Sequence, residues 1–487
     1  MAGGIWNKNE LPVLPGFYLN FTAAALAAIR QGARGVVVLP VRAHWGPVGE
    51  FKTIYTETDI AKIYTDDETG GANAKKTIRM ALLGGAQKVL AYRLVDTNAL
   101  PAGIILQDTT EEPVNVLKLE TLYPTTRSFK VTVQDNPLDG TKKDVKLYEG
   151  SALLRTFTFT GDSIQAAADA INNDPGNELI KATKLDDGNG VLVNVSSQSL
   201  TGGNSGLENI LAADYTDFLE AAEAQQFNIF SLDGVADETI QTSVKAWVKR
   251  LRDEGKGIMA VLGGSAADDI ASDAVAKAIA RSEGFNYEGI VNLGTGAILD
   301  GVSYSSAQIA PFIAGLIGGQ QLSESTTYAA TPFDDVTRRW TNSEQKLAVQ
   351  NGVFLLIHDG TRVKVLRGVN SRSTLELTQN NSWKKIRAIR VMDAFNSDML
   401  AAAEEYYIGK INNTEEGRLA LIGAFKRYME VHAQAGTIEA EGWDVYLDPD
   451  YYGDSATLTP EPDQVFPVWT AKLTDAMEII LGKFIVQ

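Results

Sequence analysis

The fold is decided by a short apolar run near the N-terminus, Val36-Val37-Val38-Leu39. A continuous run of β-branched and aliphatic residues is typical of a strand that is buried on both faces. A helical pattern follows at residues 72–83 and stops at Gly84-Gly85, and a second strand is predicted for residues 88–95. The succession of strand, helix and strand predicts a parallel sheet.

The same alternation returns after residue 213. Strands of about four to eight residues separated by amphipathic helices predict a mostly parallel sheet with helices on both faces. The predicted helices are 214–225, 238–253, 268–282 and 305–316, and the predicted strands are 227–230, 258–262 and 289–293.

Residues 97–210 follow a different pattern, with one short predicted helix at 163–172 among alternating segments. Turn signals such as Asp139-Gly140 and Asp187-Gly188 separate these segments. The predicted strands include 129–133, 145–148, 156–159 and 191–195. We interpret this stretch as a β-rich domain inserted into a surface loop of the α/β domain, where insertions are tolerated.

The remaining residues predict an α+β domain. Strands at 353–357 and 362–366 flank the turn His358-Asp359-Gly360. Further predicted elements are a helix, or a strand running into a helix, at 386–407, a helix at 415–434, and strands at 465–473 and 477–486. The last strand is apolar on both faces, which predicts burial in a sheet. One face carries Met477, Ile479, Leu481 and Ile485, and the other carries Ile480, Phe484 and Val486.

The amino-acid composition of the chain limits the classes of function that we expect for it. The 487 residues suggest about three domains, and the net charge of −17 disfavours direct binding to nucleic acid. The chain has no cysteine and three histidines, so we expect no disulfide, metal site or cofactor. The longest apolar stretch, 309–317, falls short of a membrane span, so no membrane insertion is expected. No signal peptide is visible at the N-terminus, which predicts folding in a cytoplasm.

Enzyme motifs are incomplete. Gly294-Thr295-Gly296 follows a predicted strand, but Leu299 stands where the dinucleotide fingerprint needs glycine. No Gly-x-Ser-x-Gly elbow occurs, and His44 is interpreted as a loop residue packed near Trp45. An α/β-fold hydrolase or nucleotide-binding enzyme stays an alternative. It would place its ligand near Leu232-Asp233 or Gly294-Thr295, at the carboxyl ends of strands.

Charge is segregated in the last third of the chain. Residues 361–390 contain eight basic side chains and one acidic one, whereas residues 437–463 contain eight acidic side chains and no basic one. Blocks of opposite sign suggest a self-complementary surface between subunits, although each could equally be a solvated face. The candidate residues are Arg362, Lys364, Lys384, Lys385, Arg387, Glu439, Glu441 and Asp444.

Both termini resemble strands without a local partner. Phe17, Leu19 and Phe21 alternate with Tyr18, Asn20 and Thr22, the period of a strand with one apolar face. An unpaired strand recruits another chain by β-augmentation. We therefore expect each end to pair with a neighbouring subunit.

Several segments, in chain order, resemble the tail sheath proteins of contractile phage tails, phage-tail-like particles and R-type bacteriocins. They are Gly3-Gly4-Ile5-Trp6, Pro15-Gly16-Phe17-Tyr18-Leu19-Asn20-Phe21, Gly35-Val36-Val37-Val38-Leu39-Pro40, Trp45-Gly46-Pro47, Ala310-Pro311-Phe312-Ile313-Ala314-Gly315, Tyr407-Ile408-Gly409-Lys410-Ile411-Asn412-Asn413, Gly417-Arg418 and Asp475-Ala476-Met477-Glu478.

The resemblance implies a multidomain fold of α/β and α+β type. It comprises a subtilisin-like, non-proteolytic α/β domain with an inserted β-rich domain, an α+β C-terminal domain, and strand-donating arms. The implied divisions are 1–22 for the N-terminal arm, 23–96 with 211–344 for the α/β domain, 97–210 for the insertion, 345–474 for the inner domain and 475–487 for the C-terminal arm.

The resemblance also implies a structural subunit and no enzyme. Such subunits form stacked hexameric rings around an inner tail tube and contract from a metastable extended state, which drives the tube through the target envelope. The implied partners are further copies of the chain, the tube protein, and baseplate and tail terminator proteins. The implied location is a virion tail or tail-like particle assembled in the bacterial cytoplasm. A non-contractile shell is a third hypothesis.

The same resemblance implies roles for single residues. The arms would use Phe17, Tyr18, Leu19, Phe21, Met477, Ile479, Ile480, Leu481, Phe484 and Val486. Residues matching a helical segment that faces the tube are Lys410, Asn412 and Arg418.

Overall fold

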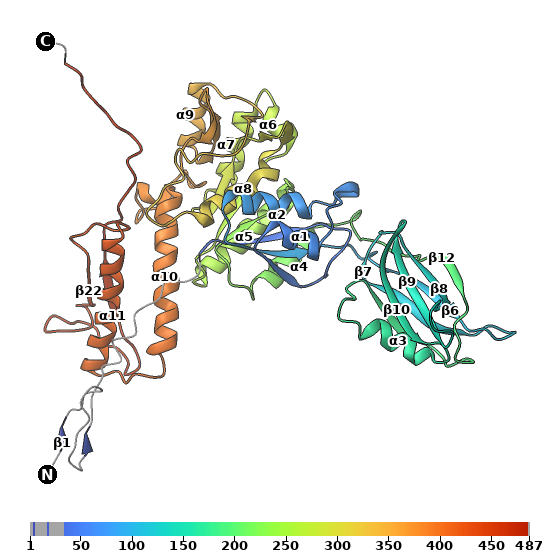
Figure 1. Ribbon diagram of the computed structural model, residues 1–487. Helices are drawn as coiled ribbons and strands as arrows, with labels where there is room; N and C mark the ends of the chain where they lie inside the picture. Colours follow the sequence, from blue (N-terminus) through green and yellow to red (C-terminus); the bar gives the residue numbers. More distant parts are fainter. Residues whose placement is uncertain (1–2, 5–16, 19–33, 486–487) are drawn as a thin grey trace.

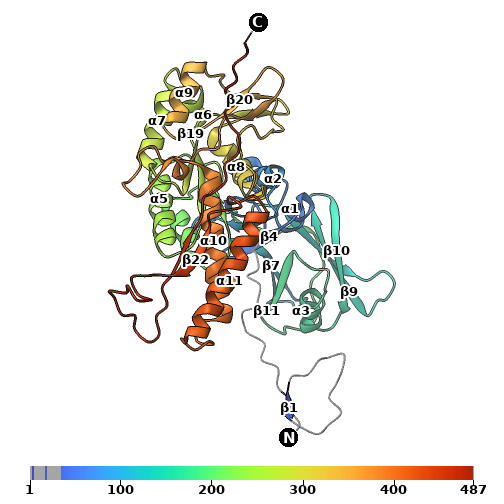
Figure 2. The same cartoon turned by 90° about the vertical axis from the view of Figure 1, so that its left-hand side faces the viewer.

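The computed structural model describes residues 3–4, 17–18 and 34–485. A β-rich body lies at one end of the molecule, a central α/β body follows, and two long helices form a further body at the other end (Figure 1). The last residues leave the helical body as an extended segment, which both Figure 1 and Figure 2 show pointing away from it.

A seven-stranded sheet forms the central body, in the order β19-β15-β14-β13-β3-β5-β4. All neighbouring strands are parallel except β4 and β5. This confirms the predicted mostly parallel sheet, whereas the antiparallel edge strand β4 has no counterpart in the prediction. The strands are β3 (Val36–Val41), β4 (Phe51–Ile54), β5 (Lys88–Arg93), β13 (Ile229–Ser231), β14 (Met259–Gly263), β15 (Ile290–Leu293) and β19 (Val353–Phe354).

Helices cover both faces of this sheet, as the run in β3 predicts. Val37 and Leu39 belong to the core beneath α2 and α8, whereas Val36 and Val38 belong to the core beneath α4 and α5. The helices of the central body are α1 (Glu57–Ile63), α2 (Ala74–Gly84), α4 (Ala212–Ala222), α5 (Glu238–Asp253), α6 (Ala266–Ile270), α7 (Ala274–Phe285), α8 (Ser306–Gly319) and α9 (Asn342–Gln350).

The single helix predicted for residues 268–282 is wrong, because the chain forms α6 and α7 with a break between them. Ala271 has an extended backbone, with ψ of 153°. Asp269, in the last turn of α6, accepts hydrogen bonds from the backbone and hydroxyl groups of Ser306. Tertiary contacts therefore fix α6 separately from α7.

The close approach of α2 and α8 depends on glycine. A Cβ atom at Gly315 would lie 2.0 Å from the carbonyl oxygen of Ala81, and one at Gly84 would lie 2.1 Å from that of Phe312. Any larger side chain at the crossing would force the two helices apart.

The β-rich body is a sandwich of two antiparallel sheets, β10-β9-β8-β12 and β11-β7-β6. Phe129, Val131 and Leu147 of one sheet and Leu117 and Leu119 of the other share its core. The elements are β6 (Pro101–Gln107), β7 (Asn115–Pro124), β8 (Phe129–Asp135), β9 (Lys142–Glu149), β10 (Ala152–Thr160), α3 (Ile164–Asn172), β11 (Ile180–Lys184) and β12 (Val195–Ser199).

The strand predicted for residues 191–195 is wrong in its bounds, because β12 begins at Val195. Leu192 instead forms an antiparallel bridge with Asp108, and the amide of Val193 donates to the carbonyl of Gln107. Residues 191–194 therefore border the other sheet before the chain enters β12.

The helical body is built on α10 (Ile386–Tyr406) and α11 (Glu415–Gln434), and a hairpin of β22 (Asp444–Leu447) and β23 (Pro467–Thr470) packs against α11. This resolves the predicted ambiguity at residues 386–407 in favour of a helix. Figure 2 shows α10 and α11 side by side. Of the described residues, 34–485 contain no helix that is both long and apolar enough to cross a membrane.

Two small sheets of short strands pack on the core of the central body. The predicted strand 353–357 is divided, since β19 joins the central sheet and β20 (Leu356–His358) pairs with β21 (Val363–Val365). A further small sheet contains β16 (Ala297–Leu299), β17 (Val302–Tyr304) and β18 (Asp335–Val336).

Candidate functional site

The C-terminal segment, residues 475–485, exposes large apolar side chains. Nothing in the described part of the chain pairs with its backbone as a strand, so the strand predicted for residues 477–486 does not form within one chain. Val486 lies outside the described residues. The exposed fractions are 91% for Met477, 69% for Ile479, 84% for Ile480, 92% for Leu481, 90% for Phe484 and 68% for Ile485. Such a contiguous apolar stretch indicates an interaction surface.

The first residues of this segment, which we call its root, are bound to the body through charged side chains. The carboxylate of Glu478 accepts hydrogen bonds from Thr327 Oγ1 at 2.7 Å and Ser325 Oγ at 3.2 Å. It also pairs with Arg367 Nε at 3.1 Å and Lys385 Nζ at 3.3 Å. Burial alone would raise the pKa of Glu478, but the Thr327 hydrogen bond and the two cations together lower it.

The residues just before Glu478 are fixed as well. The guanidinium of Arg387 donates to the hydroxyl group of Thr474 at 2.7 Å and also to its carbonyl oxygen, and Lys385 pairs with Asp475. Sequence reasoning named Glu478 only within the segment Asp475-Ala476-Met477-Glu478 and gave it no role of its own. The available signal was a carboxylate between the large apolar residues Met477 and Ile479.

The N-terminal strand prediction falls mostly on residues that the structure does not describe. Phe17 and Tyr18 form β2 (Phe17–Tyr18), which pairs in parallel with β1 (Gly3–Gly4). Leu19 and Phe21 lie outside the described residues. Figures 1 and 2 place the β1–β2 pair beyond the folded bodies.

The expected tube-facing residues gather around the connection between α10 and α11. Lys410 and Asn412 are exposed, but they lie in the connection and not in a helix, because α10 ends at Tyr406. Arg418 lies in α11, where its guanidinium donates to Asn413 Oδ1 at 2.9 Å.

Asn412 and Arg418 line a mainly apolar groove of about 590 Å³ on the helical body. Its apolar lining includes Met399, Leu400, Tyr407, Ile408, Ile411, Leu421, Phe425, Val465 and Trp469. Ile408 is 64% exposed, so part of this groove presents apolar surface to solvent.

The candidate intersubunit charges have partners within their own chain. Lys364 pairs with Asp359 at 2.9 Å, and Lys384 Nζ donates to the carbonyl of Ser373 at 2.6 Å. On the acidic side, Asp444 pairs with Lys426 at 2.8 Å and Glu439 with Lys472 at 3.3 Å. Arg362 and Glu441 are exposed. Within the described residues, no ion pair joins the basic block to the acidic block, so pairing between subunits stays a prediction.

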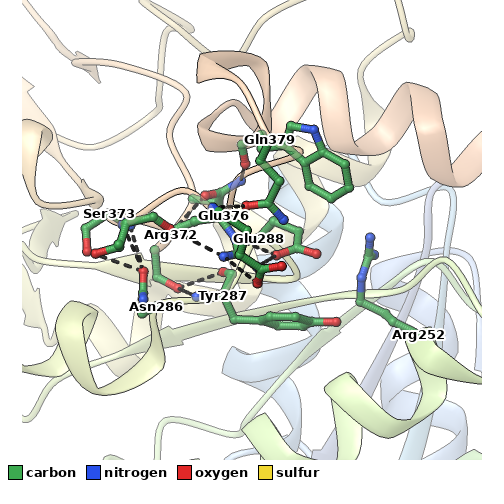
Figure 3. Close-up of polar contacts among 12 residues, drawn as sticks. Arg252, Asn286, Tyr287, Glu288, Arg372, Ser373, Glu376 and Gln379 are labelled. Atoms are coloured by element: carbon green, nitrogen blue, oxygen red, sulfur yellow. Dashed lines mark hydrogen bonds and ion pairs between the residues drawn. The ribbon is translucent and has the colours of Figure 1, made fainter.

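Three members of the basic block are buried: Arg372, Arg387 and Arg390. Figure 3 shows Arg372 between Glu288 and Glu376. Arg372 lies 2.8 Å from Glu288, and both side chains are buried. The interpretation of residues 361–390 as a surface block is therefore wrong for Arg372, which ties its loop to the central body. It is also wrong for Arg387, which donates to Thr474, and for Arg390, which donates to the carbonyl of Gln320.

The side chains at the sites of the enzyme alternative serve internal contacts. Asp233 accepts from Tyr215 Oη at 2.8 Å and from Asn73 Nδ2 at 2.8 Å, and Thr295 bonds to both backbone groups of Leu356. Within the described residues, no cluster of three or more histidine or acidic side chains could hold a metal ion.

His44 joins the sandwich to the central body. Its Nδ1 atom lies 2.9 Å from Ser205 Oγ and 3.0 Å from Thr126 Oγ1, and its Nε2 atom lies 3.0 Å from the carbonyl oxygen of Thr69. Ser205 is 2% exposed, so this hydroxyl group lies within the junction and not in an open cleft.

Three family models match the chain. The phage tail sheath protein beta-sandwich domain matches residues 71–205, the phage tail sheath protein central domain matches 208–371, and the phage tail sheath C-terminal domain matches 378–487.

Two relatives match over most of the chain, and a third matches over nearly half of it. The uncharacterized protein YqbK of Bacillus subtilis (strain 168) is 27% identical over 82% of this chain and 81% of its own length. The phage-like element PBSX protein XkdK of the same strain is 26% identical over the same shares. A tail sheath protein of Clostridium phage phiCD119 is 24% identical over 46% of this chain and 58% of its own.

Solved structures share the fold. The crystal structure of a sheath tail protein from Desulfitobacterium hafniense has a TM-score of 0.69 at 23% identity, covering 94% of this chain and 100% of that chain. The anti-feeding prophage helical sheath in its contracted state has a TM-score of 0.57 at 14% identity, covering 98% and 99%.

The fold and the exposed terminal segment define a multidomain α/β structural subunit with a β-sandwich domain. The three family models together span residues 71–487 with short gaps. The chain belongs to the phage tail sheath protein family, as the sequence resemblance predicts.

Proposed function

We propose that this chain assembles as stacked hexameric rings around an inner tail tube and contracts from a metastable extended state, driving the tube through the target cell envelope. Family membership supports the sheath role. Among proteins of similar fold, the anti-feeding prophage sheath and a sheath of an extracellular contractile injection system are both described in contracted states. No nucleotide is required if the energy lies in the difference between two packings of one chain.

The observation that carries the proposal is the apolar C-terminal segment, which has no strand partner among the described residues of its own chain. Donated to a neighbouring subunit, a strand of about six residues would add about four hydrogen bonds of ~1 kcal/mol net each. It would also bury several large side chains at about 1.5–3 kcal/mol each. Ordering the segment offsets part of this gain, and several kcal/mol per junction remain.

Strand donation assigns the arm role to residues 17–21 and 475–487. The arms would keep subunits joined while the folded bodies move past one another during contraction. The tube-facing role of Lys410, Asn412 and Arg418 belongs to this proposal, supported by their position beside the α10–α11 groove. Baseplate and terminator proteins would bound the helical stack, in a virion tail or tail-like particle assembled in the bacterial cytoplasm.

The central body is, in this proposal, a subtilisin-like domain of residues 23–96 and 211–344 that has lost protease chemistry. Support comes from the parallel sheet in which β3, the first strand of the central body, lies between β5 and β13. Residues 97–210 would project outward and residues 345–474 would form the inner domain.

Deletion of residues 475–487 tests the proposal. We expect a folded subunit with an unchanged circular dichroism spectrum that no longer forms long tubes in negative-stain images. The full chain should form tubes of two lengths and diameters, corresponding to extended and contracted states. Long tubes formed by the truncated chain would contradict strand donation by this arm.

A further inference from the structure

Glu478 points into the body, whereas its neighbours point away from it. The Glu478 side chain is 7% exposed, while the flanking residues Met477 and Ile479 are 91% and 69% exposed. A carboxylate is costly to bury unless it is paired and hydrogen-bonded. Its burial therefore calls for a specific reason.

The donors around Glu478 come from separate parts of the fold. Ser325 and Thr327 lie in the loop after α8, Arg367 follows β21, and Lys385 immediately precedes α10. All four reach the carboxylate within 3.3 Å. A carboxylate offers about four lone-pair sites, so these donors use its accepting capacity. One side chain thus joins the C-terminal segment to three segments of the body.

The contacts that bind the C-terminal segment to the body end at Glu478. Residues 480–485 make no hydrogen bond or ion pair with any other described residue. Thr327 Oγ1, which donates to Glu478, also accepts from the amide of Gly368, so the loop that binds the carboxylate is itself fixed. The boundary between held and free chain therefore falls immediately after Glu478.

We propose that Glu478 is a positioning residue for strand donation: its carboxylate anchors the root of the C-terminal arm, so that residues 479–485 leave the body in a fixed direction. The proposal rests on the proposed arm exchange between subunits. A fixed root reduces the entropy that the arm loses on docking, and it transmits the pull of a neighbouring subunit to the central and helical bodies. Removing the carboxylate leaves Arg367 and Lys385 without their shared partner.

The test exploits the absence of cysteine from the sequence. A spin label on Leu481→Cys, at an exposed position, reports arm mobility in the unassembled full chain. In Glu478→Gln we expect a more mobile label. We also expect the chain concentration needed for tubes to form to rise about tenfold, since losing a hydrogen bond to a charged group changes an equilibrium constant by about that factor. The matched control is Glu430→Gln, which changes an exposed carboxylate of α11 and should alter neither measurement.

A second variant separates anchoring from loss of folding. Arg367→Gln should raise label mobility less than Glu478→Gln does, because three other donors to Glu478 remain. The double variant should be no more mobile than Glu478→Gln, because that change already weakens the contact with Arg367. Unchanged mobility in Glu478→Gln, or fully additive effects, would overturn the anchor. A chain truncated after Glu478 tests arm exchange by itself. If that chain fails to form tubes while Glu478→Gln assembles normally, the anchor is wrong and strand donation stands.

Discussion

The ring of Trp45, from the loop after β3, lies edge-on to the ring of Tyr123 in β7, with centroids 5.2 Å apart. Trp45 thus reaches from the central body into the sandwich core, where it is 5% exposed. The guanidinium of Arg127 lies 4.8 Å from the Trp45 ring and pairs with Glu149 at 2.7 Å. A side chain from outside the inserted segment therefore completes the core of the insertion.

Trp45→Ala should destabilise the sandwich and loosen its attachment. Truncating a buried Trp to Ala typically costs about 3–5 kcal/mol. We expect a lower midpoint of thermal unfolding and faster proteolysis at the links around residues 96–100 and 204–211. Tyr55→Ala, at a position 61% exposed, is the control and should leave both measurements close to wild type. Equal behaviour of the two variants would show that Trp45 does not hold the sandwich.

The central sheet was predictable because its signal is local. β3, β5 and β14 are short apolar runs, and α5 forms at the predicted residues 238–253. Elements with mixed composition escaped prediction. β7 contains Lys118 and Glu120, whose side chains pair with each other along one strand, so its apolar pattern is interrupted.

The candidate site was less predictable, because its contacts join residues far apart in the sequence. The exposure of the apolar C-terminal segment fits the expectation that it pairs with another subunit, since the described residues of its own chain provide no strand partner. The anchor at Glu478 depends on Thr327 and Arg367, which are more than 100 residues away along the chain. Spacing along the sequence carries no sign of these contacts.

Gly315→Ala should separate α2 from α8. The added Cβ would lie 2.0 Å from the carbonyl oxygen of Ala81, and overpacking of this kind typically costs about 1–3 kcal/mol. Gly423→Ala in α11 is the control, since no atom lies within 4 Å of its added Cβ. That change should be neutral or stabilising, because Ala favours a helix over Gly by about 1 kcal/mol. Chemical denaturation of both variants provides the measurement, and a neutral Gly315→Ala would refute the close crossing.

Breaking the buried pair in Figure 3 should be more harmful than removing both partners. Glu288→Gln leaves the Arg372 guanidinium with no buried partner, which typically costs about 3–5 kcal/mol. Replacing Glu288 and Arg372 together by Leu and Met should cost less, because no buried charge then remains. Arg339→Ala, which removes an exposed pair with Asp335, should leave the denaturation midpoint unchanged. A double replacement as harmful as the single one would contradict this account.

His432 predicts a defined dependence of stability on pH. It is 1% exposed in α11, with ring centroids 4.6 Å from Phe395 and 4.5 Å from Tyr428. Among the described residues, neither ring nitrogen has a hydrogen-bond partner. Burial lowers the pKa of His432 from 6.5 to about 4, and the positive charge of Arg34 contributes in the same direction, against the opposing charge of Asp398.

Because the folded pKa lies below the unfolded one, the unfolded chain binds the proton more readily between about pH 4 and 6.5. The neutral imidazole is therefore compatible with the fold above pH 6.5, and stability is lost as the pH falls toward 4. His432→Phe keeps an aromatic ring and removes the titration. As the pH falls from 6.5 to 4, the free energy of unfolding of His432→Phe should rise by about 2–3 kcal/mol relative to that of the wild type. Urea denaturation at each pH provides the measurement. Leu419→Phe, at an exposed position of α11 without a titratable group, should follow the pH dependence of the wild type. A constant difference between His432→Phe and wild type from pH 6.5 to 4 would exclude a buried neutral His432.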